Sequence, residues 1–424
     1  MPNASSPPRL LVCTDTYPPQ VNGVSVVTSL SVVGLAERGW EVAVAAPRYP
    51  VVARDAFPPE AHRDGTTDGL RLPSAPLPFY PDLRLSLPNR AALARLVDRH
   101  RPHLLHCATE FSLGWLGQSV ARPRRIPVVT SYHTDFSRYT EAYGVGWLRP
   151  TVAGHLGRFH QRAVRTYTPS APAAQDVRAL GARDVEVWGR GVDTALFHPR
   201  QRSDALRAAY CRREAFLFLH VGRLAAEKGV ERIVRAYART RARLPDGAVH
   251  LVIAGAGPRA DALRAMGTDG ITFLGNLDRR EILPRLYASA DAFLFSSVTE
   301  TLGLVVLEAM ASGLPVIAPP AGGVADHLRH DVNGLAVPPH DVDAMADAMV
   351  ALVLDRARSA ALGHGARATA EVLDWRHELD RLDASYRDVI DRHAPGRAAV
   401  SAERFGRLER GSSAQHRGRR GAFA

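Results

Sequence analysis

The chain of 424 residues is 46% hydrophobic, which is enough apolar material for two or three folded domains. Its three cysteines lie far apart and form no C-x-x-C pair, which argues against a disulfide framework and against a zinc site. A formal net charge of +11 leaves nucleic acid, anionic lipid and anionic small molecules as candidate partners. No signal peptide or apolar run of transmembrane length is visible, so we expect a cytoplasmic protein, either free or peripheral on the inner face of the plasma membrane.

The first half of the chain alternates expected strands with expected helices. Apolar runs predict strands at 9–14, 41–46, 104–107, 127–131, 166–168 and 185–188, with helices at 24–38 and 90–100. Residues 48–88 are rich in Pro, Asp and Gly, and we expect an irregular excursion there. The β-loop-α-β order indicates a parallel sheet with crossover helices.

The second half restarts the same pattern at residue 216. Strands are expected at 216–221, 249–254, 271–274, 292–295 and 315–318, with helices between them. Two successive units of this kind predict an α/β protein made of two Rossmann-like domains that face each other across a central cleft, where ligands bind beyond the carboxyl ends of the strands. We place the first domain at 1–188 and the second at 189–377, followed by a C-terminal helix at 378–393 that packs back on the first domain and a disordered basic tail at 394–424.

Lys228 is the one lysine of the chain, among 53 arginines (54 Lys+Arg less this residue). A compact ammonium fits between crowded phosphate oxygens where the wide fork of arginine does not. Gly222-Arg223 ends an apolar run, and Lys228-Gly229 leads into a helical pattern. The setting favours a phosphate-binding lysine over a surface lysine of no special role.

A polar loop and a helix after the strand at 292–295 carry two glutamates eight residues apart, Glu300 and Glu308. The helix starts near Gly303, and the free N–H groups of its first turn favour an anion. Carboxylates also accept hydrogen bonds from sugar hydroxyls. Glu308 lies among apolar residues, so its charge needs a partner, and the alternative to a ligand is a salt bridge on the helix.

Two segments of the first half also follow expected strands. One contains Asp15 and Asn22-Gly23, where a glycine at the mouth of a helix lets backbone approach a phosphate, although Asn-Gly by itself indicates only a turn. The other runs from Ser131 through His133, and a lone histidine is more often structural than catalytic.

The helix expected at 90–100 is basic and amphipathic, and Arg122, Arg124 and Arg125 add a second basic cluster. One interpretation is a helix packed on the sheet with a solvated basic face. The other is docking onto anionic lipid. A count of charges does not separate the two.

Glu300-x7-Glu308 followed by Gly313-Leu-Pro-Val resembles the signature of the retaining family-4 glycosyltransferases, which have the GT-B architecture. Gly222-Arg223 with Lys228-Gly229 fits the same family upstream, and the similarity runs from Thr14 to about His393. The resemblance implies that Arg223 and Lys228 neutralise the leaving diphosphate of a nucleotide-sugar. It also implies that Glu308 binds the ribose hydroxyls, that Glu300 binds hydroxyls of the transferred sugar and that His133 is catalytic. Further donor contacts are implied for Gly23, Gly257, Asn276, Thr301, Leu302, Gly303 and Leu304, and acceptor contacts for Asp15, Asn22, Asp135, Tyr139 and Tyr143.

The segment around His133, with Tyr139 and Tyr143, resembles one branch in particular, which contains bacterial glycolipid mannosyltransferases and sulfoquinovosyl-diacylglycerol synthases. This implies a retaining, metal-independent transfer of mannose from GDP-mannose to a membrane glycolipid or phospholipid. The nucleotide-sugar is then a substrate, and no cofactor is expected. One alternative is a UDP-sugar-dependent transferase acting on diacylglycerol or on a small soluble acceptor. A basic nucleic-acid-binding protein is a weaker alternative, because it leaves Glu300 and Glu308 without a purpose.

Overall fold

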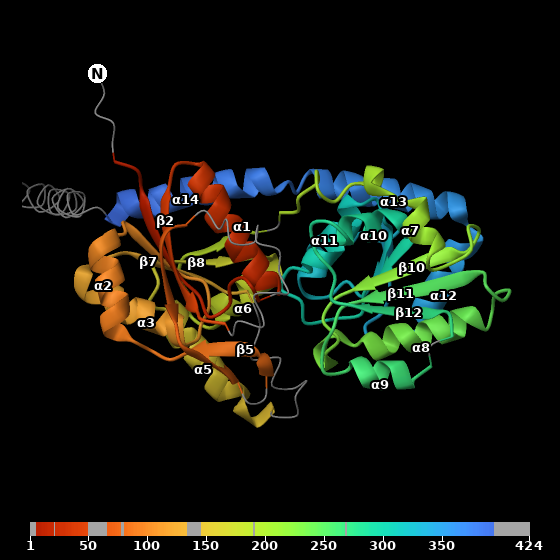
Figure 1. Cartoon of the computed structure of the whole chain (residues 1–424), viewed down its shortest axis with the longest axis horizontal. Helices are drawn as coiled ribbons and strands as arrows, with labels where there is room; N and C mark the ends of the chain where they lie inside the picture. Colours follow the sequence, from red (N-terminus) through yellow and green to blue (C-terminus); the bar gives the residue numbers. More distant parts are fainter. Residues whose placement is uncertain are drawn as a thin grey trace, which may run out of the picture.

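The computed structural model describes residues 6–20, 22–49, 66–77, 80–133, 146–189, 191–267 and 269–393 (Figure 1). They form two α/β domains that lie next to each other along the longest axis of the molecule. The segment 394–424, for which a disordered tail is expected, lies outside the described residues, as do Asp135, Tyr139 and Tyr143.

The first domain is built on a parallel sheet of seven strands. These are β1 Arg9–Cys13, β2 Glu41–Pro47, β3 Thr66–Leu72, β6 Leu104–Cys107, β7 Val128–Ser131, β8 Arg165–Thr168 and β9 Val185–Val187, in the order β3-β2-β1-β6-β7-β8-β9. Its helices are α1 Gly23–Glu37, α2 Arg90–His100, α3 Ser112–Ala121, α5 Arg149–His160 and α6 Ala171–Ala179, with short 3-10 turns at η3 Arg122–Arg124 and η4 Gly146–Leu148. Side chains alternate across β1: Leu10 and Val12 pack toward α1, whereas Leu11 and Cys13 pack toward α2 and α3.

The expectation of an irregular excursion at 48–88 is wrong for the later part of that range. β3 extends the first sheet by pairing in parallel with β2, and β4 Ser74–Leu77 pairs in antiparallel register with β5 Tyr80–Ser86. β3 is an edge strand containing Asp68 and Gly69, two residue types that are rare in strands. β3 forms because it pairs with β2, and this pairing cannot be predicted from the composition of the segment alone.

The second domain has a six-stranded parallel sheet. Its strands are β10 Phe216–Val221, β11 Val249–Ala254, β12 Ile271–Gly275, β13 Ala292–Leu294, β14 Val316–Ala318 and β15 Gly334–Ala336, in the order β12-β11-β10-β13-β14-β15. Its helices are α7 Asp204–Ala208, α8 Val230–Arg241, α9 Ala260–Ala265, α10 Leu283–Ser289, α11 Leu304–Ala311, α12 Val342–Leu354 and α13 Arg356–Glu371, with 3-10 turns at η5 Pro199–Gln201, η6 Ala226–Lys228 and η7 Gly322–Asp326. Leu217 and Leu219 face α10 and α11, whereas Phe216 and Phe218 face α8 and α12.

All strands expected from apolar runs are present, with ends that differ by one residue, and β15 is an additional short strand. The helix expected at 90–100 is present as α2. It packs through Leu93, Leu96 and Val97, which are buried in the core of the first domain. Two residues of α2 form ion pairs: Arg99 lies 2.7 Å from Asp68, and Asp98 lies 2.8 Å from Arg124, whereas Arg95 is exposed.

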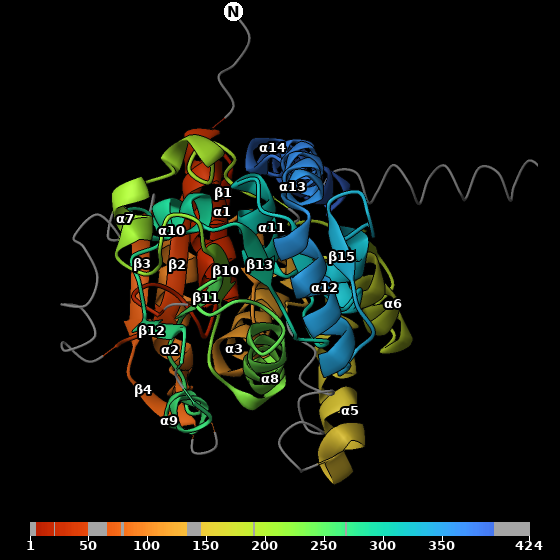
Figure 2. The same ribbon diagram turned by 90° about the vertical axis from the view of Figure 1, so that its right-hand side faces the viewer.

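The last helix, α14 Trp375–His393, begins three residues before the expected start at 378 and runs along the first domain. In Figures 1 and 2, α13 and α14 follow one another along the same side of the molecule, α13 on the second domain and α14 on the first. Leu379, Leu382 and Tyr386 are buried in the same core as Leu10 and Val12. The C-terminal segment is therefore part of the core of the first domain.

The contact between α1 and α14 can be tested at Gly34, where an added Cβ would lie 2.2 Å from Cδ1 of Leu379. We expect Gly34→Ala to lower the free energy of unfolding by about 1–3 kcal/mol, because the extra methyl group overpacks the core. Gly154→Ala is the matched control, since Gly154 is also helical and nothing lies within 4 Å of its added Cβ. That change should stabilise the protein by about 0.5–1 kcal/mol through helix propensity. Urea unfolding measures both, and equal stability of the two variants would contradict the packing of α14.

Candidate active site

Three loops at the carboxyl end of the second sheet are joined by backbone hydrogen bonds. The N–H of Gly222 donates to the Ala254 carbonyl oxygen (3.0 Å), and that of Gly255 donates to the Gly275 carbonyl oxygen (2.7 Å). Glycine is required here because an added Cβ on Gly255 would lie 1.9 Å from the Gly222 oxygen, and one on Gly257 would lie 2.4 Å from the Leu224 oxygen. The loops that follow β10, β11 and β12 thus form one continuous edge. Gly257, expected near the nucleotide base, lies on that edge.

Lys228 and Glu300, which sequence reasoning assigned to one ligand, are in direct contact: the Lys228 ammonium forms an ion pair with Oε1 of Glu300. The side chain of Lys228 is 20% exposed and that of Glu300 is 17% exposed, so both remain accessible to a ligand. The loop after β13 is held against η6 by Ser296, whose hydroxyl donates to the carbonyl oxygens of Lys228 (2.8 Å) and Gly229 (2.9 Å). The side chains are therefore brought together by backbone positions that do not depend on a ligand.

Arg223, the second predicted diphosphate cation, also has a carboxylate beside it. Its Nη1 lies 3.5 Å from Oε1 of Glu227, whose side chain is buried. Sequence reasoning missed Glu227, although a glutamate directly before Lys228 is a usable signal. Each of the two predicted cations is thus paired with a carboxylate.

Glu308 lies on α11 and is 2% exposed. Its Oε1 accepts from Nε (3.0 Å) and Nη2 (2.6 Å) of Arg279, and its Oε2 accepts from the Tyr287 hydroxyl (3.2 Å). Burial, with Glu308 nearby, raises the pKa of Tyr287 well above its usual value, so the phenol keeps its proton. The prediction that buried Glu308 needs a partner is confirmed. The partner itself, Arg279 in the loop after β12, was not identified from the sequence.

The residues between Glu300 and α11 form a tight loop that glycines make possible. Gly303 has φ +77° and precedes the first turn of α11. The N–H of Gly323 donates to the Glu300 carbonyl oxygen (2.7 Å), and an added Cβ on Gly322 would lie 2.2 Å from that oxygen. Leu302 is buried in the second core and Leu304 packs against it, so both side chains are directed into the protein. The predicted contacts of these two residues with the donor would therefore be made by their backbone atoms.

The same loop reaches the first domain. The Thr301 hydroxyl donates to the carbonyl oxygen of His133, which lies two residues beyond the end of β7. This contact places the predicted catalytic histidine beside the loop of Glu300, although 167 residues separate His133 from Glu300 in the chain (300 less 133). A second contact joins the domains where the Ala171 N–H donates to Asp326 (3.0 Å).

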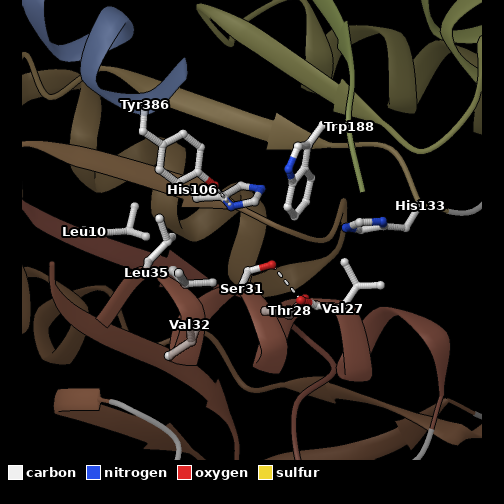
Figure 3. A pocket seen from close by; sticks show the side chains of 11 residues that line it. Leu10, Val27, Thr28, Ser31, Val32, Leu35, His106, His133, Trp188 and Tyr386 are labelled. Carbon is white, nitrogen blue, oxygen red and sulfur yellow. Dashed lines mark hydrogen bonds between the residues drawn. The ribbon is translucent and has the colours of Figure 1, made fainter. Parts of the chain in front are cut away.

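His133 is half-buried, and its ring lines a cavity of about 10 Å³ (Figure 3). Figure 3 shows the ring between Trp188 and Val27, with Thr28 further along the cavity. Burial, with the neighbouring His160, lowers the pKa of His133 to about 4, so the ring is neutral at pH 7. A neutral imidazole can donate through one nitrogen and accept through the other.

His106 lines the same cavity, is buried and was missed by sequence reasoning (Figure 3). Its Nε2 is 2.7 Å from the Ser131 hydroxyl and its Nδ1 is 2.7 Å from the Tyr386 hydroxyl. Burial lowers the pKa of His106 to about 3. His106 of β6 thus joins Ser131 at the end of β7, two residues before His133, to Tyr386 of α14.

The polar side chains of the loop after β1 contact other parts of the protein, whereas the family resemblance implied that they contact a ligand. Asp15 is fully buried, and its carboxylate accepts from the hydroxyls of Thr109 (3.0 Å) and Ser112 (2.6 Å) and from the backbone at the start of α3. Its position therefore offers no surface for the predicted acceptor contact. Asn22 caps α1, because its Oδ1 accepts from the Ser25 N–H (2.8 Å).

Two predicted donor residues lie on open surface. Gly23 is exposed at the start of α1, and no protein atom lies within 4 Å of its added Cβ. Asn276 is exposed just after β12.

Over the described ranges, no group of three or more His, Cys, Asp and Glu is placed to hold a metal ion. Within those same ranges, no helix combines the length and hydropathy that a membrane span requires.

Comparison with known proteins agrees with this geometry. Residues 21–196 match the family model described as Glycosyltransferase Family 4, and residues 215–355 match the one described as Glycosyl transferases group 1. A GDP-mannose-dependent alpha-mannosyltransferase of Corynebacterium glutamicum is 32% identical over 385 residues, which is 91% of this chain and 90% of the relative. The chain belongs to glycosyltransferase family 4. The resemblance seen in the sequence is thereby confirmed.

Other relatives of this glycosyltransferase are similar over different shares of their length. A GDP-mannose-dependent alpha-mannosyltransferase of Mycobacterium tuberculosis is 34% identical, covering 91% of this chain and 97% of the relative. A sulfoquinovosyl transferase of Arabidopsis thaliana is 33% identical, covering 73% of this chain and 61% of the relative. The structure of a sucrose-phosphate synthase from Thermosynechococcus elongatus superposes with a TM-score of 0.75 at 22% identity, covering 91% of this chain and 99% of that one. This glycosyltransferase has the GT-B fold, as the sequence predicts.

The buried histidines give this glycosyltransferase a defined dependence of stability on pH. Burial lowers the folded-state pKa of His133 and His220 to about 4 and that of His106 to about 3, against about 6.5 for histidine in an unfolded chain. The unfolded state therefore binds more protons between about pH 6.5 and 4, and stability falls as the pH is lowered through that window.

Urea unfolding midpoints measured between pH 7 and 5 should decrease steadily as the pH falls. His220→Asn, whose amide can still donate to the Leu294 carbonyl oxygen as His220 does at 2.9 Å, should make the decrease shallower. A midpoint that does not change with pH would contradict neutral, buried imidazoles.

Proposed function

We propose that this glycosyltransferase transfers mannose from GDP-mannose to a membrane glycolipid or phospholipid, with retention of anomeric configuration and without a metal ion. One observation carries the proposal: the contact between Thr301 and His133 gathers the ion pair of Lys228 and Glu300 and the neutral imidazole into one place. Mannose and GDP come from the names of relatives 32% and 34% identical that span nearly the whole chain.

The donor would lie along the edge formed by the loops of the second sheet. Arg223 and Lys228 would bind the diphosphate, Glu300 the sugar hydroxyls, and Glu308 the ribose. Lys228 has three N–H donors, which phosphate oxygens would take over from Glu300 as sugar hydroxyls replace the ammonium at that carboxylate. Gly23, at the start of α1, would let backbone approach the donor phosphate from the first domain.

In the proposed reaction, the bond between sugar C1 and the diphosphate oxygen breaks while the acceptor hydroxyl attacks C1 from the same face. The acceptor proton passes to the departing phosphate oxygen, so no enzyme nucleophile is needed. Arg223, Lys228 and the amides at the start of α11 would stabilise the charge that grows on the phosphate. His133, neutral at pH 7 because of its low pKa, would hydrogen-bond the sugar and the acceptor without adding charge.

A lipid acceptor places the enzyme at a membrane surface, and the first domain offers a basic face for it. Arg95, Arg122 and Arg125 are exposed, beyond the ion pairs that occupy Arg99 and Arg124. Each favourably placed cation is worth about 1 kcal/mol on an anionic membrane. This supports a cytoplasmic protein that is peripheral on the inner face of the plasma membrane, with no role for nucleic acid.

One further candidate has support of its own. The sulfoquinovosyl transferase relative, at 33% identity, favours the transfer of a sulfoquinovosyl group. In this candidate the donor would be a UDP-sugar and the acceptor diacylglycerol. The two candidates differ in donor base and in sugar, so the same transfer assay separates them.

Lys228 gives a sharp test of the diphosphate role. Lys228→Ala should lower kcat by about 100- to 1,000-fold, since it removes a cation aimed at the leaving phosphate. Lys228→Arg should also lose most activity, because the planar fork replaces a point charge. Arg235→Ala, on the exposed face of α8, is the control and should keep normal turnover. Steady-state kinetics with melting temperatures measure this, and near-normal activity of the Lys228 variants in folded protein would refute the role.

The donor and the metal independence are tested together in a transfer assay with membrane lipid extract as acceptor. Labelled mannose from GDP-mannose should appear in the lipid fraction, and the rate should be unchanged in EDTA because protein cations supply the charge. UDP-glucose and UDP-sulfoquinovose are the competing donors in parallel reactions. Transfer from a UDP-sugar alone would replace the mannose proposal, and loss of activity in EDTA would remove its metal-free mechanism.

A further inference from the structure

Glu308 has little hydrogen-bonding capacity left for a ligand. A carboxylate offers about four acceptor positions, and here Oε1 accepts from two nitrogens of Arg279 while Oε2 accepts from Tyr287. About one position remains, which suffices for one ribose hydroxyl and not for two. A donor that used Glu308 would therefore lie against Arg279 as well.

Arg279 is held as a rigid fork. Its guanidinium carbon lies 5.1 Å from the ring centroid of Phe197, which is fully buried, and its Nε and Nη2 both point at one oxygen of Glu308. The side chain nevertheless remains 22% exposed. Two of the five N–H donors of an arginine go to Glu308, which leaves three to offer a ligand. Such fixing lowers the entropy that is lost when a ligand binds.

The place of Arg279 matches the base of a bound nucleotide. It follows exposed Asn276 in the loop after β12, at the carboxyl end of the sheet. In a nucleotide, the 2′-hydroxyl and the base sit on adjacent ribose carbons. A ribose that donates to Glu308 therefore brings its base within a few bond lengths of a guanidinium whose Nη2 is 2.6 Å from the same carboxylate.

We propose that Arg279 is the residue that selects guanine, by donating from Nη1 and from the second N–H of Nη2, which Glu308 leaves available, to the two adjacent acceptors O6 and N7 of the base. Guanine presents these acceptors side by side, and paired N–H groups of arginine match them. Adenine places an N–H2 donor beside N7, and uracil has no two adjacent acceptors, so neither satisfies the fork. The inference rests on the proposed function, because it assumes that Glu308 binds the ribose of the donor. It names the residue that would favour GDP over UDP and ADP.

The test compares the affinities of GDP, UDP and ADP for the full chain, measured by isothermal titration calorimetry at fixed salt. Arg279→Lys is the informative variant, because it keeps a cation beside buried Glu308 while it removes the fork. Its GDP affinity should fall about 10- to 100-fold, whereas UDP and ADP affinities should change less than about threefold. Arg280→Lys is the matched control, as Arg280 is the exposed neighbour and should leave all three affinities unchanged.

The outcomes separate the inference from the function on which it rests. An equal loss for GDP, UDP and ADP would mean that Arg279 only holds Glu308, and an unchanged GDP affinity would mean that another group reads the base. Either result overturns the role of Arg279 while GDP-mannose transfer by the unaltered protein still stands. If the unaltered protein bound UDP more tightly than GDP, both the guanine assignment and the GDP-mannose proposal would fail. Melting temperatures establish that each variant is folded.

Discussion

The chain passes between the two domains twice, and the arrangement of the site depends on these two passages being joined. The N–H of Val192, on the outgoing segment, donates to the Leu373 carbonyl oxygen at 2.9 Å, and the N–H of Trp375 donates back to Val192 at 3.2 Å. The returning segment then becomes α14, which the first domain uses as core through Leu382 and Tyr386. Any rotation of one domain against the other would bend the chain at these two joined passages and would alter the contact between the Thr301 hydroxyl and the His133 carbonyl oxygen.

Charge pairing is the second constraint on the site, because partly buried carboxylates need cations. Glu227, Glu300 and Glu308 are paired with Arg223, Lys228 and Arg279, respectively. The pair of Lys228 with Glu300 joins η6 to the loop after β13, and the pair of Arg279 with Glu308 joins the loop after β12 to α11, whereas Arg223 and Glu227 lie only four residues apart. The electrostatics of the site and the packing of its loops are therefore coupled. We expect a substitution of one partner in an ion pair to shift the backbone segment that carries the other partner.

The strands were predictable because each is a short apolar run bounded by turn residues, and β1 through β14 of the two main sheets follow that pattern apart from β3. β3 depends on its partner β2, and β15 begins with Gly334, a residue type that is rare in strands, so local sequence did not reveal them. The need of Glu308 for a partner followed from its apolar neighbours. The choice of Arg279 did not, because 29 residues separate the two (308 less 279) and only the fold brings them together. For Asp15 the family resemblance implied an acceptor contact, whereas the structure directs the buried carboxylate to Ser112 and to the backbone at the start of α3.

The ion pair between Lys228 and Glu300 has a consequence for the order of events in a reaction cycle. Inorganic phosphate that drew Lys228 toward itself would leave a partly buried carboxylate without its cation, so the pair discriminates against it. Under the proposed function, a nucleotide-sugar would present phosphate oxygens to the ammonium and hydroxyls to the carboxylate at the same time, and both side chains would exchange one partner for another. Once the sugar had left with the acceptor, Glu300 would lose its hydroxyls and compete again for Lys228. The same ion pair would then weaken the binding of the nucleotide product and favour its release.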